Sequence, residues 1–195
     1  MSYLAGLDVG QVVDHMALVV VESMPERMYE VAFIYRWPLG LPNQIMIRDI
    51  KQILSSLEEN VSLNVDYTGK GQVFAEFLEH GFQQEPRLTN VMTDYSVFSQ
   101  AMKQNLASNI KLLLGEKRLL FRRGEGLHKE MLDELFDELC NYQLRITESQ
   151  VKGKPTSELG ALGYNQHDDL ATALLLALED AEQAPSSGSM YWIRH

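Results

Sequence analysis

The chain is poor in cysteine and has no long apolar run. Its 195 residues include a single cysteine, so no disulfide can form within the chain. No apolar run approaches the roughly 20 residues that a membrane-spanning helix needs, and the first residues lack the charged, then apolar, then small-residue order of a secretory leader. We therefore expect a cytosolic protein that has no contact with a membrane.

Basic residues are also scarce. The sequence has 17 Lys and Arg against 27 Asp and Glu, which gives a formal net charge of −10. This balance excludes a protein whose whole surface grips nucleic acid by electrostatics, so a polyanion would have to meet bound cations or a local basic patch. Lys and Arg side chains ordinarily belong to the solvated surface of a protein. The candidates for contact with DNA are Lys103, Lys111, Arg118, Arg122 and Arg123.

Length and composition predict one domain. A chain of this size buries one substantial core, and a hydrophobic content of 45% is ordinary for a globular protein. We expect the domain to span residues 1–182. Residues 183–195 are expected to form a flexible C-terminal tail, because they hold a Pro-Ser-Ser-Gly-Ser run.

The pattern of apolar residues predicts an α/β fold. Strands are expected at 3–9, 16–22 and about 28–37, and their short links predict an antiparallel meander. A helix at 43–59 leads to a strand at 61–65, which should run parallel to the first strand. We further expect helices at 72–80, 97–114, 127–140 and from 168, short strands at 88–92 and 118–121, and a mobile loop or poorly ordered hairpin at 150–166.

Aspartates recur where these elements end or begin. Asp8 lies where the first strand ends, Asp66 follows the fourth strand, and Asp168 and Asp169 open the last helix. Because parallel strands joined by a crossover end at one edge of the sheet, Asp8 and Asp66 should meet there, and the last helix can deliver its acids to the same edge. Clustered carboxylates suit Mg²⁺ or Mn²⁺, and two such ions support phosphodiester hydrolysis.

Ordinary structural roles are open to the same residues. A lone Asp at a strand end is commonly a turn residue, and Asp168 could cap the last helix. His167 could approach a metal or a phosphate or be structural. The combination of the aspartates with the strand order favours the metal site over separate structural roles.

Other reactive residue types are expected to be structural. Cys140 lies within a helical pattern and is predicted to be a small core residue. His15, His80 and His128 lack the spacing of zinc ligands.

The motifs together resemble the ribonuclease H-like (RuvC-like) superfamily, and more closely the nuclease domain of tailed-phage large terminase subunits. The resemblance covers about residues 3–180. It implies a mixed sheet with a three-strand antiparallel meander plus parallel strands, flanked by helices. The matching segments are Gly6-Leu7-Asp8-Val9-Gly10, Val65-Asp66-Tyr67-Thr68-Gly69-Lys70-Gly71 and His167-Asp168-Asp169-Leu170-Ala171.

The activity that the resemblance implies is a two-metal-ion DNA endonuclease, dependent on Mg²⁺ or Mn²⁺. Such an enzyme cuts double-stranded viral DNA during genome packaging in the host cytoplasm. Asp8, Asp66, Asp168 and Asp169 would be both the catalytic residues and the metal ligands. Asp14, in the hairpin near Asp8, could reach a metal or its water shell in this class, or it could serve its turn. The implied partners are double-stranded DNA, the terminase ATPase domain, the small terminase subunit and the portal protein.

The chain departs from a complete large terminase, because the Gly-x-x-x-x-Gly-Lys-Ser/Thr loop of its ATPase motor is missing from the sequence. Two alternatives stay open. One is a RuvC-like junction resolvase, although Thr172 stands where resolvases often carry another acid. The other is a catalytically silent ribonuclease H-like assembly module. An actin-like ATPase would need two such domains, for which this length leaves little room.

Overall fold

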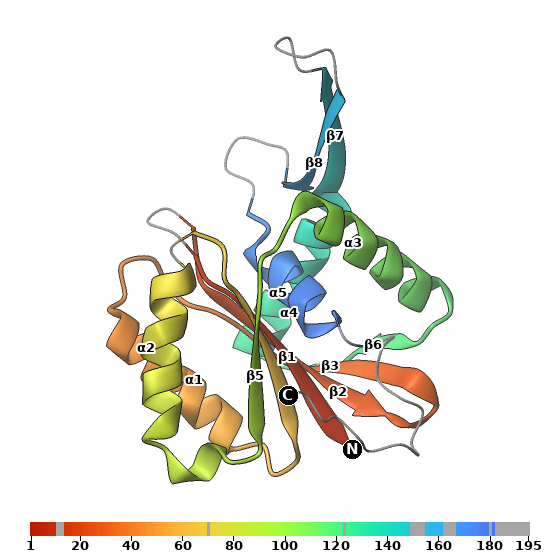
Figure 1. The fold of residues 1–195 in the computed structure, drawn as a ribbon. Helices are drawn as coiled ribbons and strands as arrows, with labels where there is room; N and C mark the ends of the chain where they lie inside the picture. Colours follow the sequence, from red (N-terminus) through yellow and green to blue (C-terminus); the bar gives the residue numbers. More distant parts are fainter. Residues whose placement is uncertain are drawn as a thin grey trace, which may run out of the picture.

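A six-stranded mixed sheet forms the centre of the computed structural model (Figure 1). The structure describes residues 1–10, 14–69, 71–122, 124–148, 155–161, 167–179 and 181. The strands of the sheet are β1 (Ser2–Asp8), β2 (Ala17–Met24), β3 (Met28–Arg36), β4 (Val61–Asp66), β5 (Val91–Ser96) and β6 (Leu119–Phe121). The helices are α1 (Asn43–Ser55), α2 (Gly71–Gln83), α3 (Gln100–Gly115), α4 (Leu127–Asn141) and α5 (Asp169–Ala177), with 3-10 turns η1 (Pro25–Arg27) and η2 (Pro86–Leu88).

The order of the strands is β5-β4-β1-β2-β3-β6. The first three strands pair antiparallel in sequence order, as predicted for the meander. After the α1 crossover, β4 pairs parallel with β1, and β5 pairs parallel with β4. Strands β1, β4 and β5 therefore end at the same edge of the sheet. Strand β6 pairs with the first residues of β3, at the opposite end.

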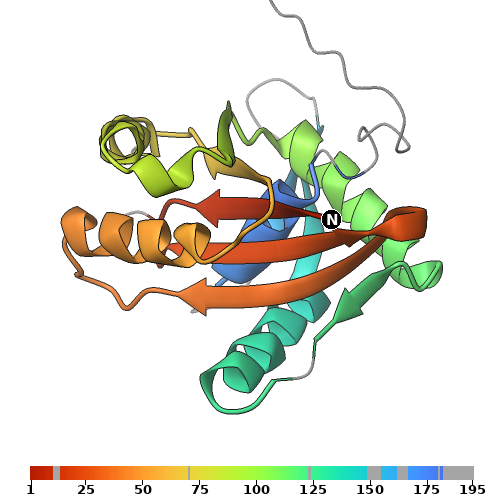
Figure 2. The same ribbon diagram turned by 90° about the horizontal axis from the view of Figure 1, so that it is seen from below.

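Helices cover both faces of the sheet (Figures 1 and 2). Helices α1 and α2 pack on one face, against a core that includes Leu7 and Leu18. Helices α3, α4 and α5 pack on the other face, against Ala17, Val19 and Val21. Successive residues of a strand point to opposite faces, so a strand covered on both sides needs apolar residues throughout. This explains the unbroken apolar run at the start of β2.

Helix α5 lies directly on β1. A Cβ built on Gly6 would come within 2.0 Å of the Ala173 carbonyl oxygen and 2.4 Å of the Ala177 nitrogen. No residue with a side chain fits between two backbones at that separation. Gly6 thus lets α5 cross the sheet two residues before Asp8.

The structure contradicts two of the sequence predictions, one for a strand and one for the cysteine. The strand predicted at 88–92 lies at Val91–Ser96, and Leu88 ends the 3-10 turn η2. The prediction followed the apolar residues, whereas pairing with β4 from Val61↔Val91 to Asp66↔Ser96 sets the strand. Cys140 is exposed on α4 and not part of the core.

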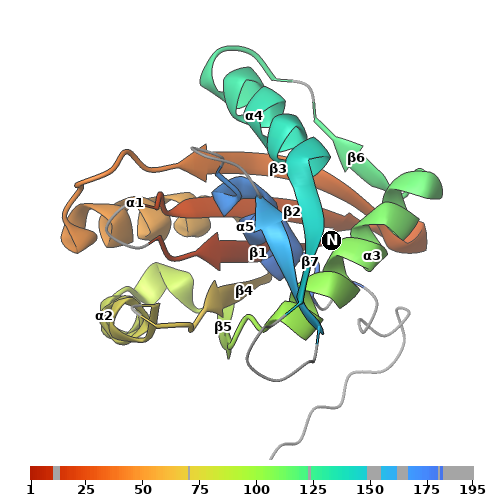
Figure 3. The same cartoon turned by 90° about the horizontal axis from the view of Figure 1, so that it is seen from above.

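A two-stranded sheet projects from the body beside α3 and α4 (Figures 1 and 3). Strand β7 (Tyr142–Glu148) follows α4 directly and pairs antiparallel with β8 (Pro155–Ala161). The predicted loop or hairpin at 150–166 is therefore a hairpin arm where the structure describes it, and 149–154 and 162–166 lie outside the described residues. The tail predicted at 183–195 also lies outside them.

No helix within the described ranges combines the length and the apolar character that crossing a membrane requires.

Candidate active site

Two of the predicted aspartates end neighbouring parallel strands. Asp8 is the last residue of β1 and Asp66 the last residue of β4. Gly6 meets α5, and Asn64 bonds to Glu179 just beyond α5, so both strands turn these positions toward the α5 face. Since side chains alternate with a period of two, Asp8 and Asp66 also point to that face. The predicted meeting of their carboxylates at one sheet edge agrees with this geometry.

The other two aspartates lie at the start of α5. Asp168 occupies the N-cap position and Asp169 the first helical position. Asp169 is buried, with 4% of its surface exposed. Its pKa is raised to about 6 by burial, against the lowering effect of His167, His15 and Arg36, while the charge of Asp168 raises it.

The pKa of Asp8 shows that the four carboxylates share one electrostatic environment. It is raised well above the ordinary value by burial first, and then by the negative charges of Asp169, Asp66 and Asp168. Lys103 acts in the opposite direction. Charges at the end of β4 and the start of α5 thus act on a carboxylate at the end of β1, although these segments are far apart in the sequence. The negative charges of these four carboxylates repel one another, and this repulsion costs free energy unless a bound cation or protonation offsets it.

Asp66 is oriented by the turn that follows it. Its Oδ1 accepts a hydrogen bond from the backbone N–H of Thr68 at 2.9 Å. The Thr68 hydroxyl oxygen in turn accepts from the backbone N–H of Phe98 at 3.2 Å, which ties this turn to the segment before α3. Asp66 therefore serves the turn and still lies in the carboxylate cluster.

The oxygen atoms of this cluster fit a hard divalent cation. Asp169 Oδ2 is buried without a hydrogen-bond partner, and it lies 3.7 Å from Nδ1 of His167. A buried carboxylate oxygen without a partner is costly, and a metal ion is one group that would satisfy it. Among the residues that the structure describes, however, no three Asp, Glu, His or Cys side chains are already close enough to form a metal site. These side chains would have to move closer together to share an ion.

Two histidines border the cluster. The rings of His15 and His167 are 5.2 Å apart in an edge-to-face arrangement. His15 Nδ1 lies 2.9 Å from the Trp37 carbonyl oxygen, which fixes its ring at the start of β2. The sequence provided no zinc-type spacing for His15. Its place opposite the end of β1 follows from the hairpin that joins the two strands.

The predicted basic residues lie in two different places. Lys103, in the first turn of α3, acts on the pKa of Asp8, and its Nζ lies 5.2 Å from the Phe98 ring centroid. Lys111 is exposed two turns further along α3. Arg118 and Arg122 flank β6 at the opposite end of the sheet, where Arg122 pairs with Glu22 and Glu30. Arg123 lies outside the described residues.

Further polar residues hold α5 in place and were not singled out from the sequence. Glu138 on α4 is bonded both to Arg36 and to the first turn of α5. Beyond the other end of α5, Glu179 Oε2 accepts hydrogen bonds from the Asn64 amide and, at 2.8 Å, from the Ser96 hydroxyl. The sequence signal for Glu138 was an acidic residue within the apolar pattern of 127–140, because acids are rarely buried without a partner.

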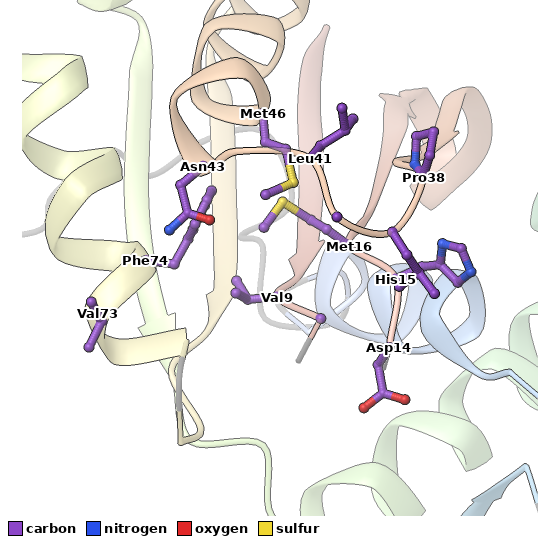
Figure 4. Close-up of a pocket in the computed structure, with 13 residues that line it drawn as sticks. Val9, Asp14, His15, Met16, Pro38, Leu41, Asn43, Met46, Val73 and Phe74 are labelled. Atoms are coloured by element: carbon purple, nitrogen blue, oxygen red, sulfur yellow. The ribbon is translucent and has the colours of Figure 1, made fainter. Parts of the chain in front are cut away.

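A pocket of about 490 Å³ opens on the α1 and α2 side of the same edge (Figure 4). Its apolar lining includes Val9, Met16, Met46 and Phe74. Asp14 is exposed at its margin, and Figure 4 shows its carboxylate directed away from the apolar side chains. Asp14 is not among the charges that shift the pKa of Asp8. Its role as a metal ligand stays a prediction.

The strand order, the mixed pairing and the placement of α5 are those of the ribonuclease H-like fold, so the predicted fold class is confirmed. No protein-family model and no curated protein sequence matches the chain.

Solved structures do match it, with phage terminases among them. The HK97 bacteriophage large terminase gives a TM-score of 0.60 at 15% identity, covering 91% of this chain and 39% of that one. A mutant nuclease domain of the large terminase subunit of bacterial virus Sf6, with manganese and beta-thujaplicinol, gives 0.60 at 17% identity, covering 91% and 88%. The manganese-bound large terminase nuclease domain from bacteriophage SPP1 gives 0.52 at 10% identity, covering 92% and 86%.

A resolvase has the same fold. The yeast mitochondrial Holliday junction resolvase Ydc2 gives a TM-score of 0.55 at 11% identity, covering 92% of this chain and 79% of that one. At these identities the likenesses establish the fold alone. The chain corresponds in extent to the terminase nuclease domains, and it spans well under half of the HK97 terminase.

Proposed function

We propose that this chain is a divalent-metal-dependent DNA endonuclease of the terminase type, which cuts double-stranded viral DNA during genome packaging. One observation carries the proposal: carboxylates from β1, β4 and α5 converge at one sheet edge, where three of them raise the pKa of Asp8. The matched terminase nuclease domains, two of them with manganese, support the choice of chemistry.

Asp8, Asp66, Asp168 and Asp169 would hold Mg²⁺ or Mn²⁺, with two ions expected. When bound, such ions activate a water molecule and stabilise the leaving oxygen of a phosphodiester. The protein's own contribution is to hold the ligands. Strand β1 presents Asp8, the Thr68 N–H orients Asp66, and α5 buries Asp169.

Lys103 would meet the DNA phosphate next to this cluster. It lies on α3, close enough for its charge to lower the pKa of Asp8, and it is half-buried. The positive charge of Lys103 would attract a DNA phosphate toward the carboxylate cluster, which otherwise repels it. His167, exposed beside the start of α5, is an accessory candidate for contact with the scissile phosphate.

The test is cleavage of supercoiled plasmid in Mg²⁺ or Mn²⁺. We expect the wild type to nick or linearise it and Asp66→Ala to lose this activity. Asp133→Ala is the matched control, because Asp133 is an exposed acid on α4 and outside the cluster. Wild-type protein that binds Mn²⁺ but leaves plasmid intact would support the silent assembly module instead.

A junction resolvase is the second candidate, because Ydc2 matches the fold over most of both chains. Thr172, where resolvases often carry an acid, is buried in α5 with 2% exposure. Parallel assays on a four-way junction and on linear duplex separate the two functions. Cleavage confined to the junction would favour the resolvase.

In the terminase interpretation the ATPase motor domain, the small subunit and the portal protein act with this domain in the host cytoplasm. An acidic nuclease domain is expected to bind DNA weakly by itself, since its net charge is −10. The partners would therefore hold the DNA while this domain cuts it.

A further inference from the structure

One buried acid beside the carboxylate cluster has no part in the chemistry proposed above. Glu138 lies on α4 with 7% of its side chain exposed. Its Oε2 accepts a hydrogen bond from the backbone N–H of Ala171 at 2.9 Å, and its Oε1 accepts one from Nη1 of Arg36 at 2.9 Å. One carboxylate thus joins the end of β3 to the first turn of α5.

The hydrogen bond from the Ala171 N–H to Glu138 caps the start of α5. The first N–H groups of a helix have no carbonyl partner within the helix, and side chains near its start usually supply one. In α5 the residue at the N-cap position is Asp168, whose side chain makes no capping hydrogen bond. Glu138 supplies an acceptor from a different helix.

The other half of the link reaches the row of residues that contains Asp8. In the β1–β2 register Asp8 lies opposite Ala17, and in the β2–β3 register Ala17 lies opposite Arg36. Residues directly opposite each other on neighbouring strands share a face. Arg36 and Asp8 therefore stand in one row, and the bonds from Arg36 to Glu138 and from Glu138 to Ala171 connect that row to the turn that carries Asp169.

We propose that Glu138 is a positioning residue, which sets the start of α5, and with it Asp168 and Asp169, at the correct place relative to Asp8. This inference rests on the proposed function, because the placement matters when these acids bind metal together. A contribution to stability alone does not explain why an acid is buried at position 138. Buried ion pairs commonly contribute little net stability, and the neighbouring Asp169 is a like charge.

Variants of Glu138 separate positioning from simple structural support. Glu138→Ala removes the acceptor, whereas Glu138→Gln keeps an oxygen that can accept from the Ala171 N–H. Glu134→Gln is the matched control, because Glu134 also lies on α4 and bonds to Arg36, but its bond does not reach α5. The measurements are the Mn²⁺ dissociation constant by calorimetry, plasmid nicking at saturating Mn²⁺, and the melting temperature without metal.

We expect Glu138→Ala to weaken Mn²⁺ binding by about 10- to 100-fold, as for other residues that orient metal ligands. Glu138→Gln should recover most of the affinity, and Glu134→Gln should match the wild type. A lower melting temperature in Glu138→Ala with wild-type Mn²⁺ affinity would show a structural residue and overturn the inference. Wild-type protein that neither binds Mn²⁺ nor nicks plasmid would instead overturn the proposed function.

Glu138→Asp keeps the test available if the Ala variant does not fold. The shorter side chain retains the charge near Arg36 and withdraws its oxygen from the Ala171 N–H. We expect it to fold and to lose several-fold in Mn²⁺ affinity. Unchanged affinity in this variant also contradicts a positioning role.

Discussion

Gly6 of β1 and Ala173 of α5 touch through their backbones, since a Cβ on Gly6 would lie 2.0 Å from the Ala173 carbonyl oxygen. This contact sets the height of α5 above the sheet, and so the height of the acids at its start. The helix is buried along its whole length, from Asp169 to Ala177. Its position depends on the absence of one side chain.

Gly6→Ala should therefore push α5 away from β1. We expect a loss of unfolding free energy of about 1–3 kcal/mol or more, together with weaker Mn²⁺ binding, because the acids move with the helix. Gly115→Ala is the control, since nothing lies within 4 Å of a Cβ there. Chemical denaturation and calorimetry measure both effects. Equal stability of the two variants would contradict the tight contact.

Asp8→Asn should separate stability from activity. The change removes one charge from a group in which burial and three other carboxylates raise the pKa of Asp8. We expect the metal-free variant to melt at a higher temperature than the wild type at pH 8, because less repulsion remains. Mn²⁺ should no longer stabilise it, and plasmid cleavage should fall more than about a hundredfold. A lower melting temperature without metal would argue against repulsion in the cluster.

Glu138 should make stability depend on pH. Burial is the main cause that raises its pKa from 4.5 to about 7. The folded protein therefore holds a proton that the unfolded chain releases, so this stabilisation is complete below pH 4.5 and is lost as the pH rises through about 7. The loss amounts to at most about 3 kcal/mol. Urea denaturation between pH 4.5 and 8 should show a shallower decline for Glu138→Gln than for the wild type, and parallel curves would contradict this assignment.

Lys103→Ala should weaken DNA binding and reduce the slope of log affinity against log salt by about one. Arg122→Ala is the informative comparison, because Arg122 lies at the far end of the sheet and pairs with Glu22 and Glu30. We expect little change in DNA affinity for this variant. An equal loss for both would mean that DNA extends along the sheet to β6, as the basic cluster in the sequence suggested.

Local patterns were enough to predict most of the fold. The apolar runs near Leu7 and Val19 and the helical spacing around Ile50 predict the meander and the crossover that place Asp8 beside Asp66. Strand β7 was missed, although Leu144 and Ile146 alternate with polar residues, because the helical pattern before it and the glycines after it dominated the prediction. The shift of β5 had a similar cause, since pairing outweighed local apolar content.

The supporting residues of the site could not be found in this way. Arg36, Glu138 and Ala171 lie on three elements, and only the packing of α4 against the sheet brings them together. The same limit applies to Arg118 and Arg122, whose closeness in sequence gave no information about which end of the sheet they occupy. Sequence spacing predicts contacts within one element and between strands that a crossover joins. It does not predict contacts between elements that are distant in the sequence.

The position of α5 after the other described elements has a consequence for synthesis. Asp168 and Asp169 leave the ribosome after Asp8, once the six strands of the main sheet and α1 to α4 have been made. Until α5 inserts, the apolar face of β2 at Ala17, Val19 and Val21 lacks its cover. Folding and assembly of the carboxylate cluster are thus completed by the same late event. A chain that stops before α5 would lack Asp168 and Asp169, so under the proposed function it could not assemble the full set of metal ligands.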